Sequence, residues 1–421
     1  MYVRVGRSAR DPLTATAWAI EDVVFVSCDV AMVNDKLRQA ILDRLPAEVP
    51  KHNVILSATH THDSLVFFDN VYAHPDGDVM TASECLAWAG ERIAGAIATA
   101  WRDRQPRQIG RAFGHAVVGH NRYAIYSDET GAMYGKTNRP DFHHIGGYED
   151  HSVDMLFTWE PDGRLAGVTL AIPCPSQVEE HLLEFSADYW HEVRAELQRR
   201  FGKDLFVVGW CAPAGDQSPH FLLYGREEEE MRQRRGVTER QEIALRIADA
   251  VERALACTKP TGETPVFRHV GRELQLPRFS ISQKDVSWSQ AQYDKWIAEG
   301  GDPTSWWPIR LREVIDTANG LVKPAPVTAR IHVLRIGTVG IATNPFELFL
   351  DYSLCIKARS PAAQTVLTQL TDGSCLYLPS ERAVAAGSYG AAAVVCPVGP
   401  AGGRQLVEET LKTLNELFEE K

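Results

Sequence analysis

The sequence predicts an α/β fold, a layered mixed β-sheet with flanking helices, and three observations favour it. Short apolar runs alternate with amphipathic segments over the first 110 residues, as expected for βαβ units. Neither an internal repeat nor a low-complexity segment interrupts this order. Hydrophobic residues make up 44% of the 421 residues, enough to bury a sizeable core. We therefore expect one compact domain over residues 1–421.

The first half of the chain supplies strands and helices in turn. A turn at Glu21-Asp22 separates two strands within residues 15–30. Asn34 is the expected N-cap of the next helix, because its side chain can accept from free backbone N–H groups. The remaining elements are a helix over 34–45, a buried strand over 53–58 and an amphipathic helix over 81–103.

The second half begins with a hairpin, since Pro161-Asp162-Gly163 is a strong turn signal between two apolar runs. Thr238 and Gln241 form a capping box at the start of another helix. We expect strands over 154–160, 166–173, 204–212, 328–337 and 339–345, and helices over 185–201, 238–255 and 403–418.

Residues 285–320 break the alternation and carry four tryptophans with short helical periods, Trp288, Trp296, Trp306 and Trp307. Local packing of an insertion against the main body is slightly favoured. The alternative is a cap over a ligand site, because aromatic side chains often line pockets.

Composition excludes several classes of function. The net charge of −11 without a basic stripe argues against nucleic acids and anionic membranes as partners. The chain has neither an apolar run of about 18 residues nor the apolar core of a signal peptide. Eight scattered cysteines without a CxxC pair suit a reducing compartment. We expect a cytoplasmic protein without a stable membrane anchor, acting on a small molecule and possibly forming a homo-oligomer.

Polar side chains follow several of the predicted strands. His60 and His62 come directly after an apolar run, and side chains at i and i+2 of extended chain point the same way. The other polar stretches are GDQSP (215–219), NPFELF (344–349) and the turn around Tyr377. An isolated His-x-His pattern usually belongs to an ordinary polar loop. Several polar stretches at the ends of predicted strands together favour a metal-hydrolase site.

These motifs resemble the catalytic domain of the neutral/alkaline (non-lysosomal) ceramidase family. The matching stretches occur in the order of the family, over roughly residues 10–410: NVILSATHTH, GHNRYAIY, ADYWHEVR, GDQSP, NPFELFLDYSLCIKARSP and LYLPSERAVAAGSYG. The resemblance implies an α/β domain that uses one zinc ion (Zn2+) to hydrolyse an amide.

Carried over residue by residue, the resemblance implies a metal site at the strand ends with His60, Glu347 and Tyr377 as ligands. It also implies catalytic roles for four other residues. His62 would orient the substrate or a ligand, and Arg122 would contact the substrate carbonyl or its developing oxyanion. Asp216 would accept a proton from water, and Ser218 or Arg122 would stabilise the oxyanion.

The sequence departs from the family at the second histidine ligand. Cys174 stands in that position, at the end of AIPCPSQ. A thiolate is a good zinc ligand, so we expect Cys174 to bind the metal. The alternative is an ordinary buried thiol, with the ligand supplied by a nearby residue of the set Glu179, Glu180, His181, His143 and His144.

Further departures concern the substrate. Asp63 follows His62 directly and is expected to orient an imidazole. We expect neither a secretion signal nor a C-terminal immunoglobulin-like domain of the kind found in true ceramidases. We therefore expect a zinc-dependent hydrolase in which metal-activated water attacks an amide or related bond of a small soluble substrate rather than ceramide.

Three alternatives stay open. The first is a metal-independent esterase or amidase with Ser218 as nucleophile and His62 as its base. The second is a hydrolase of a glycosidic or other polar bond, since a fold does not fix a reaction. The third is a degenerate homologue that binds metal or ligand without turnover.

Overall fold

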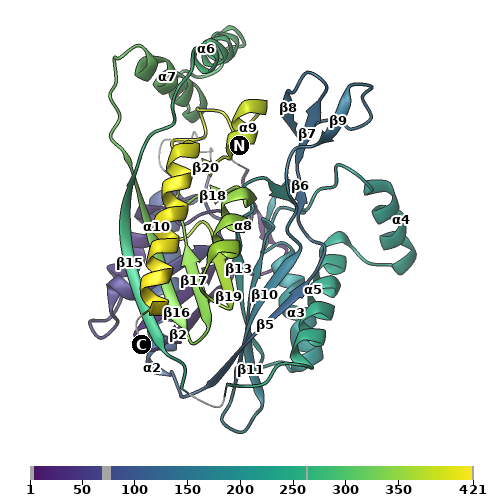
Figure 1. Cartoon of the computed structure of the whole chain (residues 1–421), viewed down its shortest axis with the longest axis vertical. Helices are drawn as coiled ribbons and strands as arrows, with labels where there is room; N and C mark the ends of the chain where they lie inside the picture. The colour runs from purple at the N-terminus through teal and green to yellow at the C-terminus, as the bar shows by residue number, and fades with distance from the viewer. Residues whose placement is uncertain (1–3, 69–76, 262–263, 420–421) are drawn as a thin grey trace.

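A computed structural model describes residues 4–68, 77–261 and 264–419 of the chain. Over these residues the fold is mixed α/β, with helices on the outer faces of several sheets (Figure 1). The sequence led us to expect one layered sheet. Two four-stranded, two three-stranded and three two-stranded sheets are found instead in the described part of the chain.

The first sheet has the order β2-β3-β4 and contains the predicted hairpin. The strands are β2 (Ala15–Ile20), β3 (Val23–Cys28) and β4 (Val54–Ala58). Glu21 takes a positive φ of 50° in the turn between the first two. Helix α1 (Asp35–Leu42) connects the parallel pair β3 and β4, and Asn34 caps it as predicted, 2.8 Å from the backbone nitrogen of Leu37.

The second sheet has the order β13-β11-β10-β5 and includes the hairpin predicted around Pro161-Asp162-Gly163. Its strands are β5 (Gln108–His115), β10 (Ser152–Trp159), β11 (Leu165–Ile172) and β13 (Phe206–Cys211). The third sheet has the order β15-β16-β17-β19. Its strands are β15 (Phe267–Leu276), β16 (Val327–Ile336), β17 (Val339–Thr343) and β19 (Gln364–Thr368).

The inner faces of these three sheets share one apolar core. Phe25, Trp210 and Ile341 belong to this cluster, and the rings of Phe25 and Trp210 lie 4.9 Å apart between centroids. Outer helices bury their apolar faces in three further clusters. These helices are α2 (Ala82–Arg102), α3 (Tyr189–Phe201), α5 (Glu239–Leu255), α8 (Leu350–Arg359) and α10 (Pro400–Glu419).

Two short pairs of strands position the candidate site at one end of the sheets. Strand β14 pairs with β6 in antiparallel fashion, and β18 pairs with β20 in parallel. Their bounds are β6 (His120–Asn121), β14 (Gln217–Ser218), β18 (Glu347–Leu348) and β20 (Tyr377–Leu378). A small sheet of order β8-β7-β9 stands beside them, made of β7 (Tyr123–Tyr126), β8 (Gly131–Met133) and β9 (Phe142–Ile145). The remaining elements are β1 (Ser8–Ala9), β12 (Glu184–Phe185), the 3₁₀ turn at Lys51–Asn53, α4 (Gly225–Arg235) and α9 (Glu381–Ala386).

The tryptophan-rich segment forms two helices, α6 (Gln283–Ala298) and α7 (Trp306–Ala318), which project at one end of the molecule (Figure 1). Trp306 and Trp307 pack against the main core, whereas Trp288 remains 41% exposed. This arrangement favours local packing, and the role of a cap stays a prediction. Among the helices that the structure describes, none combines the length and the apolar character needed to cross a membrane.

Candidate functional site

His60 is held in a defined orientation at the end of β4. Its backbone has a positive φ of 63°, an uncommon conformation for a residue with a side chain. Ring nitrogen Nδ1 lies 2.5 Å from the carbonyl oxygen of Ala31, so Nδ1 carries the hydrogen and donates it. The other nitrogen, Nε2, lies 3.4 Å from a carboxylate oxygen of Glu347. In a neutral imidazole Nε2 is then an acceptor that faces a second acceptor.

Glu347 and Tyr377 are direct partners in the parallel pair of β18 and β20. The Tyr377 hydroxyl donates a hydrogen bond to the Glu347 carboxylate. Burial acts to raise the pKa of Glu347, but His60 and then Arg122 lower it below its usual value. Both side chains are almost fully buried. The register of two short strands thus brings together residues that are 30 positions apart in the sequence.

Arg122 lies behind this group and is also buried. Its Nη2 donates to the carbonyl of Gly215 at 2.8 Å and to the Tyr377 hydroxyl at 3.3 Å. Its Nη1 donates to the Tyr134 hydroxyl at 3.4 Å. Burial acts to lower the pKa of Arg122, but the neighbouring tyrosines, Tyr377 first, and Glu347 raise it well above its usual value. The guanidinium is therefore a fixed positive charge next to Glu347.

His62 points to a different partner from His60, although the two rings meet edge to face with centroids 5.0 Å apart. Its Nδ1 lies 3.1 Å from the Glu180 carboxylate. Nε2 of His220 lies 3.6 Å from the other oxygen of Glu180. Burial lowers the pKa of His62 despite the opposing effect of Glu180. His62, Glu180 and His220 are each between 23% and 33% exposed at the side chain.

Gln177 and Tyr134 connect these two halves. Nε2 of Gln177 donates to Glu180 at 3.2 Å and to the Tyr134 hydroxyl at 3.0 Å. The same hydroxyl donates to Oγ of Ser218 at 3.1 Å. The contacts close a circuit that we call the polar ring, and its members are His60, His62, Glu180, Gln177, Tyr134, Arg122, Tyr377 and Glu347.

Ser218 and Asp216 are both buried beside the ring. Ser218 Oγ also accepts the backbone N–H of His220 at 3.1 Å, so its hydrogen bonds run to Tyr134 and His220. Asp216 accepts the backbone N–H of Leu350 at 3.0 Å and the side-chain amide of Asn121 at 3.1 Å. Asp216 therefore anchors the first residue of α8. Burial raises the pKa of its carboxyl to about 6.

Cys174 is fully buried, and its contacts do not favour the expected role as a ligand. Its sulfur lies 3.5 Å from the carbonyl of Pro175 and 3.8 Å from that of Val118. Burial raises the pKa of the thiol well above its usual value. Over residues 4–68, 77–261 and 264–419, no three side chains of His, Cys, Asp or Glu are grouped closely enough to hold a metal. His60, Glu347 and Cys174 thus do not form such a group, and a cysteine ligand stays a prediction.

The other donors considered from the sequence also lie apart. His181 is 90% exposed at its side chain, and Glu179 binds Arg10 and Arg240. His143 and His144 bond to each other at the surface. Asp63 has Arg4 as its charged neighbour, 3.7 Å away, and burial raises its pKa to about 7. Of the alternatives, Glu180 belongs to the polar ring, through His62 rather than His60.

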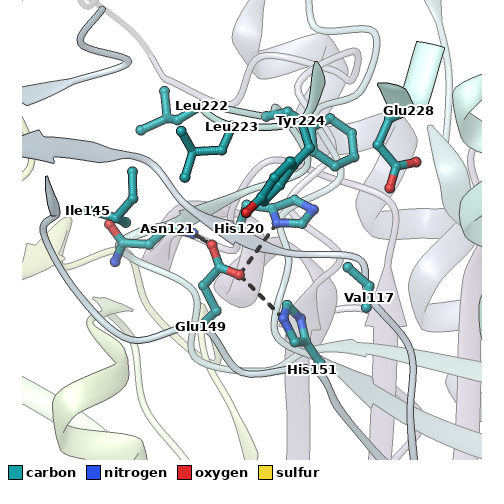
Figure 2. A pocket seen from close by; sticks show the side chains of 11 residues that line it. Val117, His120, Asn121, Ile145, Glu149, His151, Leu222, Leu223, Tyr224 and Glu228 are labelled. Carbon is teal, nitrogen blue, oxygen red and sulfur yellow. Dashed lines mark hydrogen bonds and ion pairs between the residues drawn. The ribbon is translucent and has the colours of Figure 1, made fainter. Parts of the chain in front are cut away.

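A pocket of about 360 Å³ lies beside the site, next to β6 (Figure 2). Glu149 Oε2 lies 3.5 Å from His120 and 3.3 Å from His151, and the three side chains form one wall. Asn121 lines the pocket and also holds Asp216. Neither this group nor Tyr134, Gln177 and His220 was predicted from the sequence. Signals were present for His120, which stands in GHNRYAIY, for Gln177, which ends AIPCPSQ, and for His220, which directly follows GDQSP.

Comparison with known proteins finds similarity in three-dimensional structure. No protein-family profile and no curated protein matches the chain. Solved structures do match, and two of them are ceramidases. One is a neutral ceramidase from Pseudomonas aeruginosa, with a TM-score of 0.64, 18% identity, and coverage of 94% of this chain and 66% of the other. The second is a ceramidase complexed with C2, with a TM-score of 0.65, 17% identity, and coverage of 94% and 67%.

The chain thus spans about two thirds of the length of the ceramidases that it matches. Nearly all of it takes part in the match, which agrees with the extent of the sequence motifs, roughly residues 10–410. The resemblance inferred from those motifs is confirmed at the level of the backbone: this chain has the fold of the neutral ceramidases.

Proposed function

We propose that this protein is a zinc-dependent hydrolase of the ceramidase kind that cleaves an amide or related bond of a small substrate. The observation that carries the proposal is the approach of His60 Nε2 to Glu347 at 3.4 Å. Nδ1 of His60 donates to a carbonyl, so Nε2 approaches the carboxylate either as the donor of a protonated imidazole or as an acceptor that shares a bound cation with it.

A zinc ion fits this arrangement. Two atoms bound to one tetrahedral zinc at about 2.1 Å lie about 3.4 Å apart, close to the spacing observed here. A ligating histidine commonly donates its other N–H to a carbonyl, as His60 does to Ala31. The Tyr377 hydroxyl on the same carboxylate supplies a third donor. Three protein ligands leave a position open, which is typical of catalytic rather than structural zinc. The bound ion would supply Lewis acidity, which acidifies water and polarises a carbonyl.

The chain's own residues would perform the remaining tasks. Arg122 holds a buried positive charge beside Tyr377, where it could stabilise a developing oxyanion. Burial lowers the pKa of His62, which favours the neutral imidazole that could accept a proton. In the described contacts Ser218 Oγ accepts from the Tyr134 hydroxyl and the His220 N–H and has no bond to His62, which supports a positioning role over that of a nucleophile activated by His62.

The test measures metal and activity together. Purified wild-type protein should contain close to one zinc per chain, and removal of the metal by a chelator should abolish hydrolysis of 4-nitroacetanilide until zinc is restored. His60→Ala should lose both metal and activity. His143→Ala is the matched control, because that histidine is exposed and outside the ring. Full activity in protein shown by elemental analysis to be metal-free would refute the proposal.

A further inference from the structure

The pocket beside β6 is a second cavity, separate from the polar ring (Figure 2). Its volume of about 360 Å³ suits a small organic molecule. Eleven of the described residues line it, from the segments 117–121, 145–151 and 221–228, and none of them belongs to the polar ring. The pocket therefore offers room for a ligand apart from the site proposed for hydrolysis.

Glu149 gives one wall of this pocket a negative charge. Its Oε2 lies 3.5 Å from Nδ1 of His120 and 3.3 Å from Nε2 of His151, and its Oε1 accepts the backbone N–H of Asn121 at 3.1 Å. Burial acts to raise the pKa of Glu149, but the two imidazoles lower it to about 2, so the carboxyl is ionised at neutral pH. The side chain lines the pocket and is 35% exposed, so a ligand can reach it.

No lysine or arginine of the pocket wall offsets this charge, as judged from the lining residues that the structure describes. In the described ion pairs Glu149 meets only the imidazoles of His120 and His151, which carry a charge only when protonated. The other carboxylate of the lining, Glu228, differs because Arg246 binds it at 2.6 Å. A cation in the pocket would therefore complement Glu149, whereas an anion would be repelled.

Apolar and aromatic side chains form the facing wall. The consecutive residues 221–224, Phe-Leu-Leu-Tyr, supply most of it, and Leu222, Leu223 and Tyr224 lie across from Glu149 in Figure 2. Tyr224 is 72% exposed. A wall of this kind can cover an apolar body, and the face of an aromatic ring also attracts a cation.

We propose that this pocket binds a small organic cation, a protonated primary amine on an aromatic or branched apolar body. The ammonium group donates to Glu149, and the body packs against the segment 221–224. A hydrogen bond between two charged groups is stronger than one between neutral groups. The alcohol of the same shape keeps the apolar contacts but loses the charged bond, and the corresponding carboxylate adds repulsion. The site does not depend on the proposed hydrolysis, because no residue of the polar ring takes part.

The experiment compares three molecules with the same phenylethyl body, 2-phenylethylamine, 2-phenylethanol and 3-phenylpropionate. The Kd of each is measured by ligand-observed NMR with the wild-type protein at pH 8 and with a chelator present. The high pH limits protonation of the two imidazoles, and the chelator removes metal ions to which an amine could bind. The amine should bind at least about 10-fold more tightly than the alcohol, and the carboxylate should bind more weakly than the alcohol.

Three variants locate the binding site. Glu149→Gln keeps the size of the side chain but removes its charge, so it should abolish most of the preference for the amine. Glu227→Gln, the same change at an exposed position of α4 outside the lining, should keep the preference. Tyr224→Ala should weaken the binding of the amine and of the alcohol alike, because it removes part of the apolar wall.

Each outcome bears on the proposal. Equal binding of the amine and the alcohol by the wild-type protein overturns it, and so does tighter binding of the carboxylate. An undiminished preference in Glu149→Gln means that the cation binds elsewhere, which overturns the assignment to this pocket. If Glu149→Gln does not fold, the exposed position of Tyr224 supplies the second test of location, and an unchanged Kd of the amine in Tyr224→Ala overturns the assignment.

Discussion

Asp216→Asn should change how the stability of the protein depends on pH. The carboxyl is buried at 2% exposure, and its pKa is raised from 3.8 to about 6, chiefly by burial. A raised pKa means that the folded state binds the proton more tightly than the unfolded state does. The protonated carboxyl therefore stabilises the folded state fully below about pH 4, and this stabilisation is lost as the pH rises through about 6.

The size of the effect follows from the two pKa values. The interval from 3.8 to about 6 corresponds to about 3 kcal/mol of unfolding free energy. Asparagine keeps the size of the side chain and the acceptor for the Leu350 N–H, but its amide nitrogen would face the amide of Asn121. That repulsion lowers stability by the same amount at every pH. The difference in unfolding free energy between wild type and variant at one pH thus contains both effects. The change of that difference with pH comes from the carboxyl alone.

The assay is urea unfolding followed by tryptophan fluorescence from pH 4 to pH 8, with chelator present throughout. The amount by which the unfolding free energy of wild type exceeds that of Asp216→Asn should fall by about 3 kcal/mol across this range. Parallel curves for the two proteins would refute the reasoning, because they would mean that the carboxyl titrates at an ordinary pKa. Asp351→Asn is a suitable control, since that carboxylate lies on the same helix α8 but binds Arg382 at the surface.

Two further predictions concern residues outside the ring. For the proposed zinc site, Cys174→Ser tests the expected cysteine ligand: the contacts of the sulfur with the carbonyls of Pro175 and Val118 favour an unchanged zinc content, and loss of the metal would confirm Cys174 as a ligand. Arg240→Met should lower the free energy of unfolding by about 3–5 kcal/mol, because it leaves the buried carboxylate of Asp11 without its partner at 2.7 Å. Denaturant unfolding measures this loss, and a change below about 1 kcal/mol would contradict it.

The sequence predicted features that depend on neighbouring residues more successfully than features that depend on packing. The caps at Asn34 and Thr238 were predicted because a cap needs only the side chain and the next three residues. The division into several sheets was missed, since alternating elements do not reveal where one sheet ends. The contact between Tyr134 and Gln177 was missed for a related reason: tertiary packing alone brings the segment after β8 against the segment after β11.

The residues of the candidate site were also predicted only in part. The sequence motifs indicated His60, Glu347, Tyr377 and Arg122, and the structure brings these four side chains together. Glu347 and Tyr377 are the first residues of β18 and β20, so the pairing of these strands fixes the direction of their side chains. His60 and Cys174 both lie outside strands, after β4 and β11, and only the side chain of His60 turns toward Glu347. Position in a motif does not determine which way a side chain turns outside a strand.

The polar ring also has a consequence for the order of folding. Its members come from segments spread between residues 60 and 377, and no single strand pair contains more than two of them. Closing such distant segments carries a loop-entropy cost that only the finished core repays. In a partly synthesised or partly folded chain the donors of the proposed zinc site would therefore be held apart. Metal affinity would arise only when the last contributing segment, β20, has docked, so metal uptake would report completion of the fold.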